Sequence, residues 1–178
     1  MQLDTFDRKI ATALAEDGRL SNVELAGRVG DGFISTSGKD PDLYSGLMEK
    51  VAEGAAEAGR DVAAIRKMIE IKVSYDRDRQ FAHEACAWWA ALALKPEQKE
   101  GIEDPVEMER VADENADRAH TRFIVSDDPD EVVEKIRPYV ELGFEDLVLH
   151  APGPDQNRFL DQFSADVLPR LREEFGAA

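Results

Sequence analysis

The chain has 178 residues, of which 43% are hydrophobic, and this length suits one domain with its own core. Acidic residues outnumber basic ones by 38 to 22, and the net charge of -16 disfavours nucleic-acid binding unless the basic residues cluster. The N-terminus lacks an apolar signal segment, and no apolar run approaches the roughly 18 residues that span a bilayer. We therefore expect a cytoplasmic protein with no membrane partner. A single cysteine, Cys86, excludes an internal disulfide framework and a multi-cysteine zinc site.

Residues 3–29 are expected to form two short helices. The first carries an apolar stripe of residues spaced four apart, namely Phe6, Ile10 and Leu14. The second begins with the signature of a capping box, in which Ser21 is the N-cap and Glu24 is its partner three residues later. Local sequence alone therefore predicts where this second helix starts.

The stretch "LDTFDRKIATALAEDGRLSNVELAGRVG" resembles the first two helices of the Lrp/AsnC family of transcriptional regulators, and "DGRLSNVE" carries most of this resemblance. Such a module reads DNA through a further recognition helix in the major groove. Here Gly30 is followed by a β-like run from Phe33 to Ser35. We therefore expect residues 1–29 to be a helix-turn-helix-like pair with no recognition helix, and we do not expect nucleic acid as a partner.

From residue 31 onward, strand-like and helical segments alternate. The strand-like segments are "GFIS", "MIEIKVSYD", "RFIVS" and "DLVLH". Helices are expected over about residues 42–58, around Trp88 and Trp89, over "MERVADENADRA", over "DDPDEVVEKIRPYVELG" and over about residues 156–175. The segment "KPEQKEGIEDP" is expected to be a loop. This alternation predicts an α/β fold with a parallel sheet. Three or four βα units are too few for a closed (β/α)8 barrel of about 250 residues, which indicates a partial barrel over residues 30–178.

The segment "GFISTSGK" at residues 32–39 ends like the phosphate loop of nucleotide hydrolases. That motif needs four residues between its glycines and a Ser or Thr after the lysine. Here five residues separate Gly32 from Gly38, and Asp40 follows Lys39. A nucleotide site is therefore not expected. The segment instead follows a strand, which is where barrel enzymes keep functional side chains.

Residues from about 25 to 176 resemble the C-terminal half of the coenzyme F420-dependent glucose-6-phosphate dehydrogenase family, a branch of the bacterial luciferase-like oxidoreductases. The resemblance rests on "LAGRVGDGFISTSGK", "KMIEIKVSYD", "EQK" followed by "DPVEMER", "RFIVSDDPDEVVEKI" and "LVLHAPGPDQNRFL", in the family's order. It implies the C-terminal half of a TIM barrel. It also implies an oxidoreductase that transfers a hydride from a phosphorylated sugar or related alcohol to the deazaflavin F420.

The resemblance further implies a substrate-phosphate site formed by Thr36, Lys39, Lys99 and Arg122. Three cations and a hydroxyl suit a dianion, because a guanidinium donates in bidentate fashion while ammonium groups act as point charges. The lysines could instead be solvated, and Arg122 could pair with one of the nearby acids. Glu100 stands where the family commonly has a histidine. This acid beside the anion site weakens the case for glucose 6-phosphate as the particular substrate.

The family's catalytic residues and its main deazaflavin contacts belong to the half that has no counterpart in this sequence. No catalytic residue is therefore predicted, and we expect the chain to be inactive by itself, as a fused or truncated form or an open reading frame without function. A half-barrel leaves sheet edges open, so we expect a homodimer or another self-association. The alternative is an Lrp/AsnC-like DNA-binding regulator whose C-terminal domain senses a metabolite.

Two further residues, His150 and Trp88, are candidate pocket residues. A histidine after a strand acts as a base only with a partner, and paired tryptophans such as Trp88 and Trp89 more often pack in the interior. His83 and Cys86 lie three apart on one helical face. Two ligands do not make a zinc site, so we expect both to pack in the core and expect no metal. The acidic run "SDDPDE" is explained by helix capping rather than by calcium binding, with Asp127 or Asp128 as the cap, Pro129 at the first helical position and Gly143 at the end of the helix.

Overall fold

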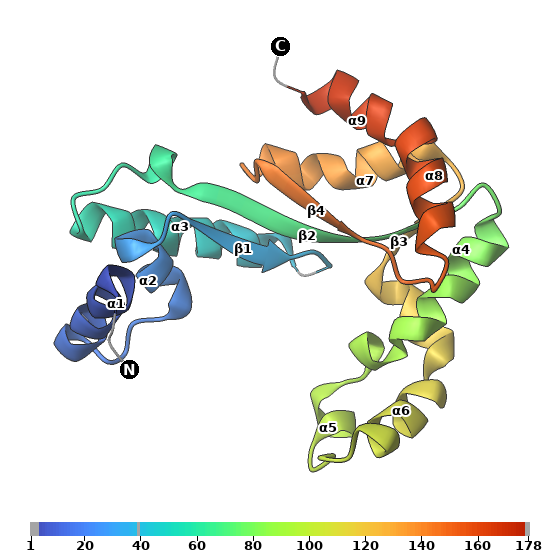
Figure 1. Ribbon diagram of the computed structural model, residues 1–178, viewed down its shortest axis with the longest axis horizontal. Coiled ribbons are helices and arrows are strands. Elements are labelled where there is room, and N and C mark those ends of the chain that lie inside the picture. Colours follow the sequence, from blue (N-terminus) through green and yellow to red (C-terminus); the bar gives the residue numbers. More distant parts are fainter. Residues whose placement is uncertain (1–3, 39, 177–178) are drawn as a thin grey trace. The chain divides into compact units, whose positions relative to one another are not determined.

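The computed structural model describes residues 4–38 and 40–176, and the chain forms two compact units. The first unit holds the residues up to Ile69 together with Leu142–Leu147, and the second holds Glu70–Glu141 and the residues from Val148 onward. Strand β2 runs through both units and is hydrogen-bonded to the other strands of a four-stranded sheet (Figure 1). The strands are β1 (Gly32–Thr36), β2 (Arg66–Tyr75), β3 (Ile124–Ser126) and β4 (Asp146–His150).

Two short helices precede β1 in the first unit, as the sequence predicts. They are α1 (Thr5–Glu16) and α2 (Asn22–Val29). The Glu24 N–H donates to the Ser21 hydroxyl at 3.3 Å, and the Ser21 N–H donates to the Glu24 carboxylate at 2.8 Å. These hydrogen bonds confirm the predicted capping box. After Gly30 the chain enters β1 rather than a third helix.

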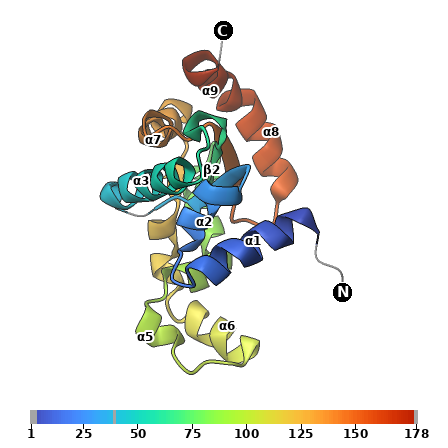
Figure 2. The same cartoon turned by 90° about the vertical axis from the view of Figure 1, so that its left-hand side faces the viewer.

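Helix α2 packs against α3 (Pro41–Glu57), which follows β1, at a close approach that two glycines permit (Figure 2). A Cβ on either Gly27 or Gly54 would lie 2.3 Å from a carbonyl oxygen of the facing helix. Arg60, just beyond α3, donates to the carbonyls of Gly27 and Gly30 at 2.9 and 2.8 Å. These contacts tie the N-terminal helical pair to the first βα unit of the sheet.

Aromatic rings fill the core of the first unit. The Phe144 ring centroid lies 5.9 Å from that of Tyr44 and 6.1 Å from that of Phe33. The Tyr44 hydroxyl donates to the Thr36 carbonyl at 2.9 Å, which holds the end of β1 against α3. A neighbouring apolar cluster consists of Val51, Ala55 and Ile65, with Val23 and Phe33 against it. A short 3-10 helix, η1 (Val62–Ala64), leads from α3 into β2.

The second unit contains β3 and most of the helices. Strand β3 runs parallel to the end of β2, with Val73 opposite Ile124 and Tyr75 opposite Ser126. The helices are α4 (Arg79–Ala85), η2 (Cys86–Ala93), α5 (Pro96–Lys99), α6 (Pro105–Asp113), η3 (Ala116–Arg122), α7 (Pro129–Glu141), α8 (Gln156–Asp166) and α9 (Leu168–Phe175). None of the helices within the described residues is long and apolar enough to cross a membrane.

Three boundaries differ from the sequence predictions. The predicted loop after residue 94 contains α5, and the helix predicted over residues 108–119 is divided into α6 and η3. The helix predicted over residues 156–175 is broken between α8 and α9, just before Pro169. Proline has no N–H to donate and its ring clashes with the carbonyl four residues earlier, so the helix cannot continue through it undisturbed.

The start of α7 follows the prediction from its capping pattern. The Asp128 carboxylate accepts from the Asp130 N–H at 2.9 Å, which identifies Asp128 rather than Asp127 as the cap. Gly143 follows the helix with a φ of 94°, a conformation that favours glycine. Capping chemistry therefore located both ends of this helix from sequence.

The glycine crossing of α2 and α3 gives the first testable prediction. We expect Gly54→Ala to lower the free energy of unfolding by about 2 kcal/mol, because the added methyl would overlap a backbone carbonyl of α2 that cannot move independently. Gly46→Ala is the matched control on the same helix, since a Cβ there meets no atom within 4 Å. It should raise the free energy of unfolding by about 0.5–1 kcal/mol. Urea unfolding followed by circular dichroism measures both, and equal effects would contradict the packing described.

Candidate functional site

The predicted phosphate ligands are distributed over both units. Thr36 is the last residue of β1 in the first unit, and Lys39 lies outside the described residues. Lys99 ends α5 and Arg122 ends η3, and both belong to the second unit. The structure therefore groups Lys99 with Arg122, while Thr36 belongs to the other unit.

Arg122 is a half-buried cation immediately before β3. Its Nε is buried and has no hydrogen-bond partner among the described residues. Several arginines of this unit, among them Arg77, Arg79 and Arg158, are paired with carboxylates, whereas Arg122 has no such pair in the described part of the chain. A buried donor without an acceptor costs free energy, so this guanidinium is suited to an anion supplied from outside the chain.

A chain of hydrogen bonds links the segment of Lys99 to that of Arg122. Gln98, beside the exposed Lys99, donates to the Asn115 side-chain oxygen at 3.0 Å. Asn115 precedes η3, the helix that ends at Arg122, and its amide donates to the Val111 carbonyl at 2.8 Å. Helix α5 is thereby fastened to the start of the helix that carries the guanidinium.

Both tryptophans are exposed, so the predicted interior packing is wrong. The side chains of Trp88 and Trp89 are 71% and 45% exposed. The backbone departs from helical geometry at Trp89, with φ at -121° and ψ at 31°, and the buried face of η2 is formed instead by Cys86 and Ala90. Trp88 and Met108 line a groove of about 570 Å³. Trp88 therefore lines a surface groove, and its role as a pocket residue stays a prediction.

His83 and Cys86 lie in different environments. Cys86 is buried, and burial raises the pKa of its thiol to about 11. His83 is exposed and stacks on His120 with ring centroids 4.5 Å apart, so the predicted core packing holds for Cys86 and is wrong for His83. No group of three or more potential metal-ligating side chains occurs within the described ranges.

His150, at the end of β4, is held by a carboxylate of β2. Its Nδ1 lies 2.6 Å from Glu70 Oε1, and Lys72 Nζ donates to Glu70 Oε2 at 3.1 Å. Lys72 is 5% exposed, so it is a buried cation that has a carboxylate partner. The Trp89 ring stands edge-on to the imidazole with centroids 4.6 Å apart.

Glu70 and Lys72 were missed as site residues by sequence reasoning. The available signal was their alternation with the apolar Ile69, Ile71 and Val73 along β2, because residues two apart on a strand share a face. Their partner His150 lies 80 positions from Glu70 in the sequence. Strand periodicity reveals the shared face but not the residue that joins it from another strand.

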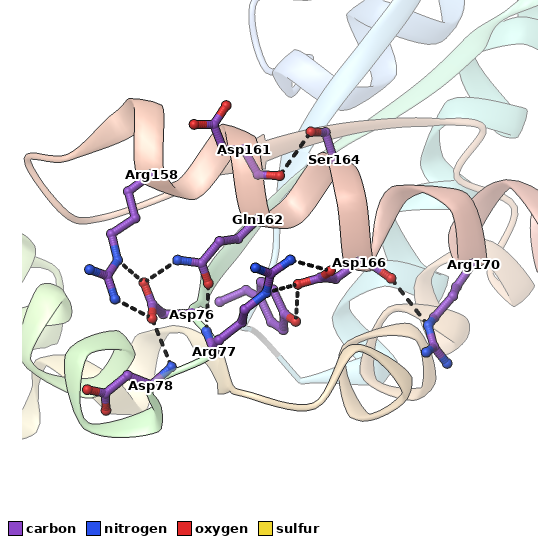
Figure 3. Close-up of polar contacts among 10 residues, drawn as sticks. Asp76, Arg77, Asp78, Arg158, Asp161, Gln162, Ser164, Asp166 and Arg170 are labelled. Carbon is purple, nitrogen blue, oxygen red and sulfur yellow. Dashed lines mark hydrogen bonds and ion pairs between the residues drawn. The ribbon is translucent and has the colours of Figure 1, made fainter.

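A polar network at the end of β2 fastens α8 to the sheet (Figure 3). Asp76 is 2% exposed and accepts from two guanidinium nitrogens of Arg158 at 2.5 and 2.8 Å and from the Gln162 amide at 3.2 Å. The Arg158 guanidinium holds the pKa of the Asp76 carboxyl below its usual range. The bidentate geometry fixes the direction in which α8 leaves the loop after β4.

A second carboxylate of α8 extends the same network. Asp166 accepts from Arg77 Nε and Nη2, each at 2.8 Å, and from the Tyr75 hydroxyl at 3.0 Å. Burial, reinforced by the hydrogen bond to Asp166, raises the pKa of Tyr75 to about 12.

The end of β2 lies beside a cavity of about 20 Å³, which is enough for one water molecule. Ser74, Asp76, Ala151 and Gly153 are among its lining residues.

A sheet of strands joined by helices, with polar side chains at the strand ends, is the arrangement of βα-barrel enzymes. The model of the luciferase-like monooxygenase family matches residues 18–146, and the chain belongs to this family. The model of the AsnC-type helix-turn-helix domain matches residues 3–30. Both resemblances inferred from sequence are thus confirmed, and the two matches overlap across α2.

Curated relatives narrow the comparison within the family. The F420-dependent glucose-6-phosphate dehydrogenase of Nakamurella multipartita is 55% identical over 154 residues, which cover 85% of this chain and 45% of that protein. F420-dependent glucose-6-phosphate dehydrogenase 1 of Rhodococcus jostii is 58% identical over 149 residues, which cover 83% of this chain and 44% of that protein. The chain therefore spans less than half the length of these curated relatives.

Solved structures confirm the predicted α/β fold of a partial barrel. An F420-dependent secondary alcohol dehydrogenase, solved with an F420-acetone adduct, has a TM-score of 0.68 and 28% identity, and the match covers 84% of this chain and 46% of that one. The F420-dependent tetrahydromethanopterin reductase of Methanopyrus kandleri has a TM-score of 0.63 and 24% identity. The match covers 84% of this chain and 48% of that one. These neighbours are luciferase-like TIM barrels, of which this chain matches about half.

The network around Asp76 predicts how stability depends on pH. Folding lowers the pKa of Asp76, so its ionised form stabilises the fold above the unfolded-state pKa of about 4, and this contribution is lost as the pH falls through the folded-state pKa. We expect Asp76→Asn to lower the free energy of unfolding at pH 7 by roughly 2 kcal/mol and to flatten its decline in acid. Urea unfolding at neutral and acidic pH tests this, with the exposed Asp161→Asn as control. Parallel pH curves for the wild type and Asp76→Asn would contradict it.

Proposed function

We propose that this chain supplies the substrate-phosphate site of a luciferase-like, F420-dependent dehydrogenase that acts on a phosphorylated sugar or alcohol. The buried Nε of Arg122, which has no acceptor among the described residues, is the observation that carries the proposal. The names of the relatives support the substrate class, since both are glucose-6-phosphate dehydrogenases. Because the chain spans less than half of them, we assign it the binding of the substrate and not the whole reaction.

In this proposal the site residues have distinct roles. Arg122 donates in bidentate fashion to phosphate oxygens, and Lys99 adds a point charge from the end of α5. The family resemblance predicts Thr36 and Lys39 as further ligands, of which Thr36 belongs to the first unit and Lys39 lies outside the described residues. A phosphate held in this way lies away from the reacting carbon, and its binding energy orients that carbon for hydride transfer.

The deazaflavin requires more of the barrel than the described residues provide. The cavity at the ends of β2 and β4 has a volume of about 20 Å³, which is far smaller than a fused three-ring system. This cavity therefore does not hold the ring system. We propose that F420 is bound mainly by the part of the barrel that the relatives possess outside the matched region.

We infer that residues 1–29 act as a structural helical pair and residues 30–178 as the half-barrel. Gly27 of α2 faces α3, and β1 occupies the position in the sequence where a recognition helix would follow. DNA binding is therefore not proposed.

We also propose that the protein is cytoplasmic. Its open sheet edges favour self-association of this chain or pairing with a complementary half-barrel.

Phosphate binding by the full chain tests the role of Arg122. We expect titration calorimetry to detect glucose 6-phosphate and inorganic phosphate, and Arg122→Ala to weaken both by roughly tenfold or more, because a charge-assisted hydrogen bond is lost. Arg118→Ala is the matched control, since Arg118 is an exposed cation on the same helix η3. Equal losses in the two variants would point to general charge rather than a site.

Activity tests the assignment of the chain to one part of the enzyme. The purified chain with F420 and glucose 6-phosphate should show no fall in deazaflavin absorbance. Co-expression with the segment of the Nakamurella multipartita relative that lies outside the matched region should restore turnover, because the two segments would complete the barrel. Turnover by the chain alone would show that the missing segment is not essential, and a folded complex without turnover would contradict the proposed dehydrogenase.

A further inference from the structure

We propose that His150 contacts the substrate, accepting a hydrogen bond at Nε2 from a hydroxyl group of the phosphorylated ligand, and that Glu70 and Lys72 are positioning residues that set its tautomer. This inference rests on the proposed phosphate site and extends it from the anionic end of the ligand to its hydroxyl groups. All three side chains belong to the second unit.

The Glu70 carboxylate determines which imidazole nitrogen carries the proton. Its Oε1 lies 2.6 Å from His150 Nδ1, and an ionised carboxylate only accepts hydrogen bonds. In the neutral ring the proton therefore resides on Nδ1, and Nε2 has a free lone pair. Within the described part of the chain, the imidazole has its hydrogen bond at Nδ1, and Nε2 is not one of the buried atoms without a partner, so Nε2 is accessible to solvent or to a ligand. The imidazole is thus held as an acceptor whose partner is to come from outside the chain.

Lys72 supports this arrangement by balancing the charge on Glu70. Its ammonium is 3.1 Å from Glu70 Oε2, on the side of the carboxylate that His150 does not occupy. The Lys72 side chain is only 6% exposed, compared with 29% for Glu70 and 19% for His150. The carboxylate therefore already has a cation, and it can orient the imidazole without requiring that ring to be charged.

The surroundings of His150 suit a small polar ligand. The Trp89 ring is 45% exposed and stands edge-on at 4.6 Å, and the Phe123 ring lies 5.9 Å away. Phe123 directly follows Arg122, so the unpartnered guanidinium and the imidazole belong to adjoining parts of the same unit. Aromatic surface with a few directed polar groups is typical of sites for small molecules. A sugar phosphate offers hydroxyl donors, apolar C–H faces and a dianion to these groups.

A purely structural role explains the cluster less well. Burying the Lys72 ammonium on a central strand costs desolvation free energy, and an apolar residue there would pack without that cost. One nitrogen of the His150 imidazole is held by a carboxylate, while the other is left accessible, which is the pattern expected of an oriented acceptor.

Ligand binding by the full chain tests the contact directly. The probes are glucose 6-phosphate and inorganic phosphate, which share the anion but differ in the hydroxyl groups. We expect His150→Leu to weaken glucose 6-phosphate binding roughly fivefold and to leave phosphate binding unchanged. His150→Gln retains an acceptor oxygen and should stay close to the wild type. Arg122→Ala, in contrast, should weaken both ligands.

A tautomer measurement tests the positioning residues independently of any ligand. Long-range ¹⁵N–¹H NMR correlations distinguish a proton on Nδ1 from one on Nε2. We expect the Nδ1–H form for neutral His150 in the wild type and in Glu70→Gln, whose amide oxygen still accepts. Glu70→Leu should lose that preference. This measurement applies even if His150→Leu does not fold.

The outcomes separate this inference from the proposed function. If phosphate binds and both His150 variants bind the two ligands like the wild type, the contact is refuted while the phosphate site stands. An Nε2–H tautomer in the wild type would refute the role of Glu70. If the wild type binds neither ligand, the phosphate site itself is wrong, and the inference fails with it.

Discussion

The backbone hydrogen bonds of β2 hold the four-stranded sheet together. This strand of 10 residues pairs with β1, β3 and β4, and it continues from the first unit into the second. Glu70 of this strand and Asp76, the residue that follows it, begin the two networks described above. Any change that breaks the pairing of β2 would therefore remove the supports of His150 and of α8 at once.

The elements that sequence predicted well are those whose signals are local. The Ser21 and Glu24 capping box, the Asp128 cap and the apolar alternation that predicted β2 involve residues a few positions apart, and the structure contains both caps and the strand. The misassigned features depend on contacts that no local pattern encodes. Trp88 is exposed beside a kink in η2, and Glu70 contacts a histidine 80 positions away.

The candidate site shows the same division between local and long-range information. The family resemblance predicted four phosphate ligands, namely Thr36, Lys39, Lys99 and Arg122. It could do so because the motifs of the family identify individual residues along the chain. Only coordinates could show that Arg122 Nε is buried without an acceptor and that Gln98 ties α5 to the segment before η3. The physical case for an anion site therefore rests on unsatisfied hydrogen bonding, while the motif explains why that donor is there.

The crossing of α2 and α3 has a consequence for how such chains can be assembled. The close approach of the two helices depends on one glycine from each helix and on Arg60, which donates to the backbone carbonyls of Gly27 and Gly30. Side chains add to this contact, because Val23 packs on the cluster of Val51 and Ala55. Glu24 and Arg28 also form ion pairs with Lys50 and Glu57 of α3. A helix grafted in place of α2 would therefore need a glycine in register with Gly54 and side chains that match this face of α3.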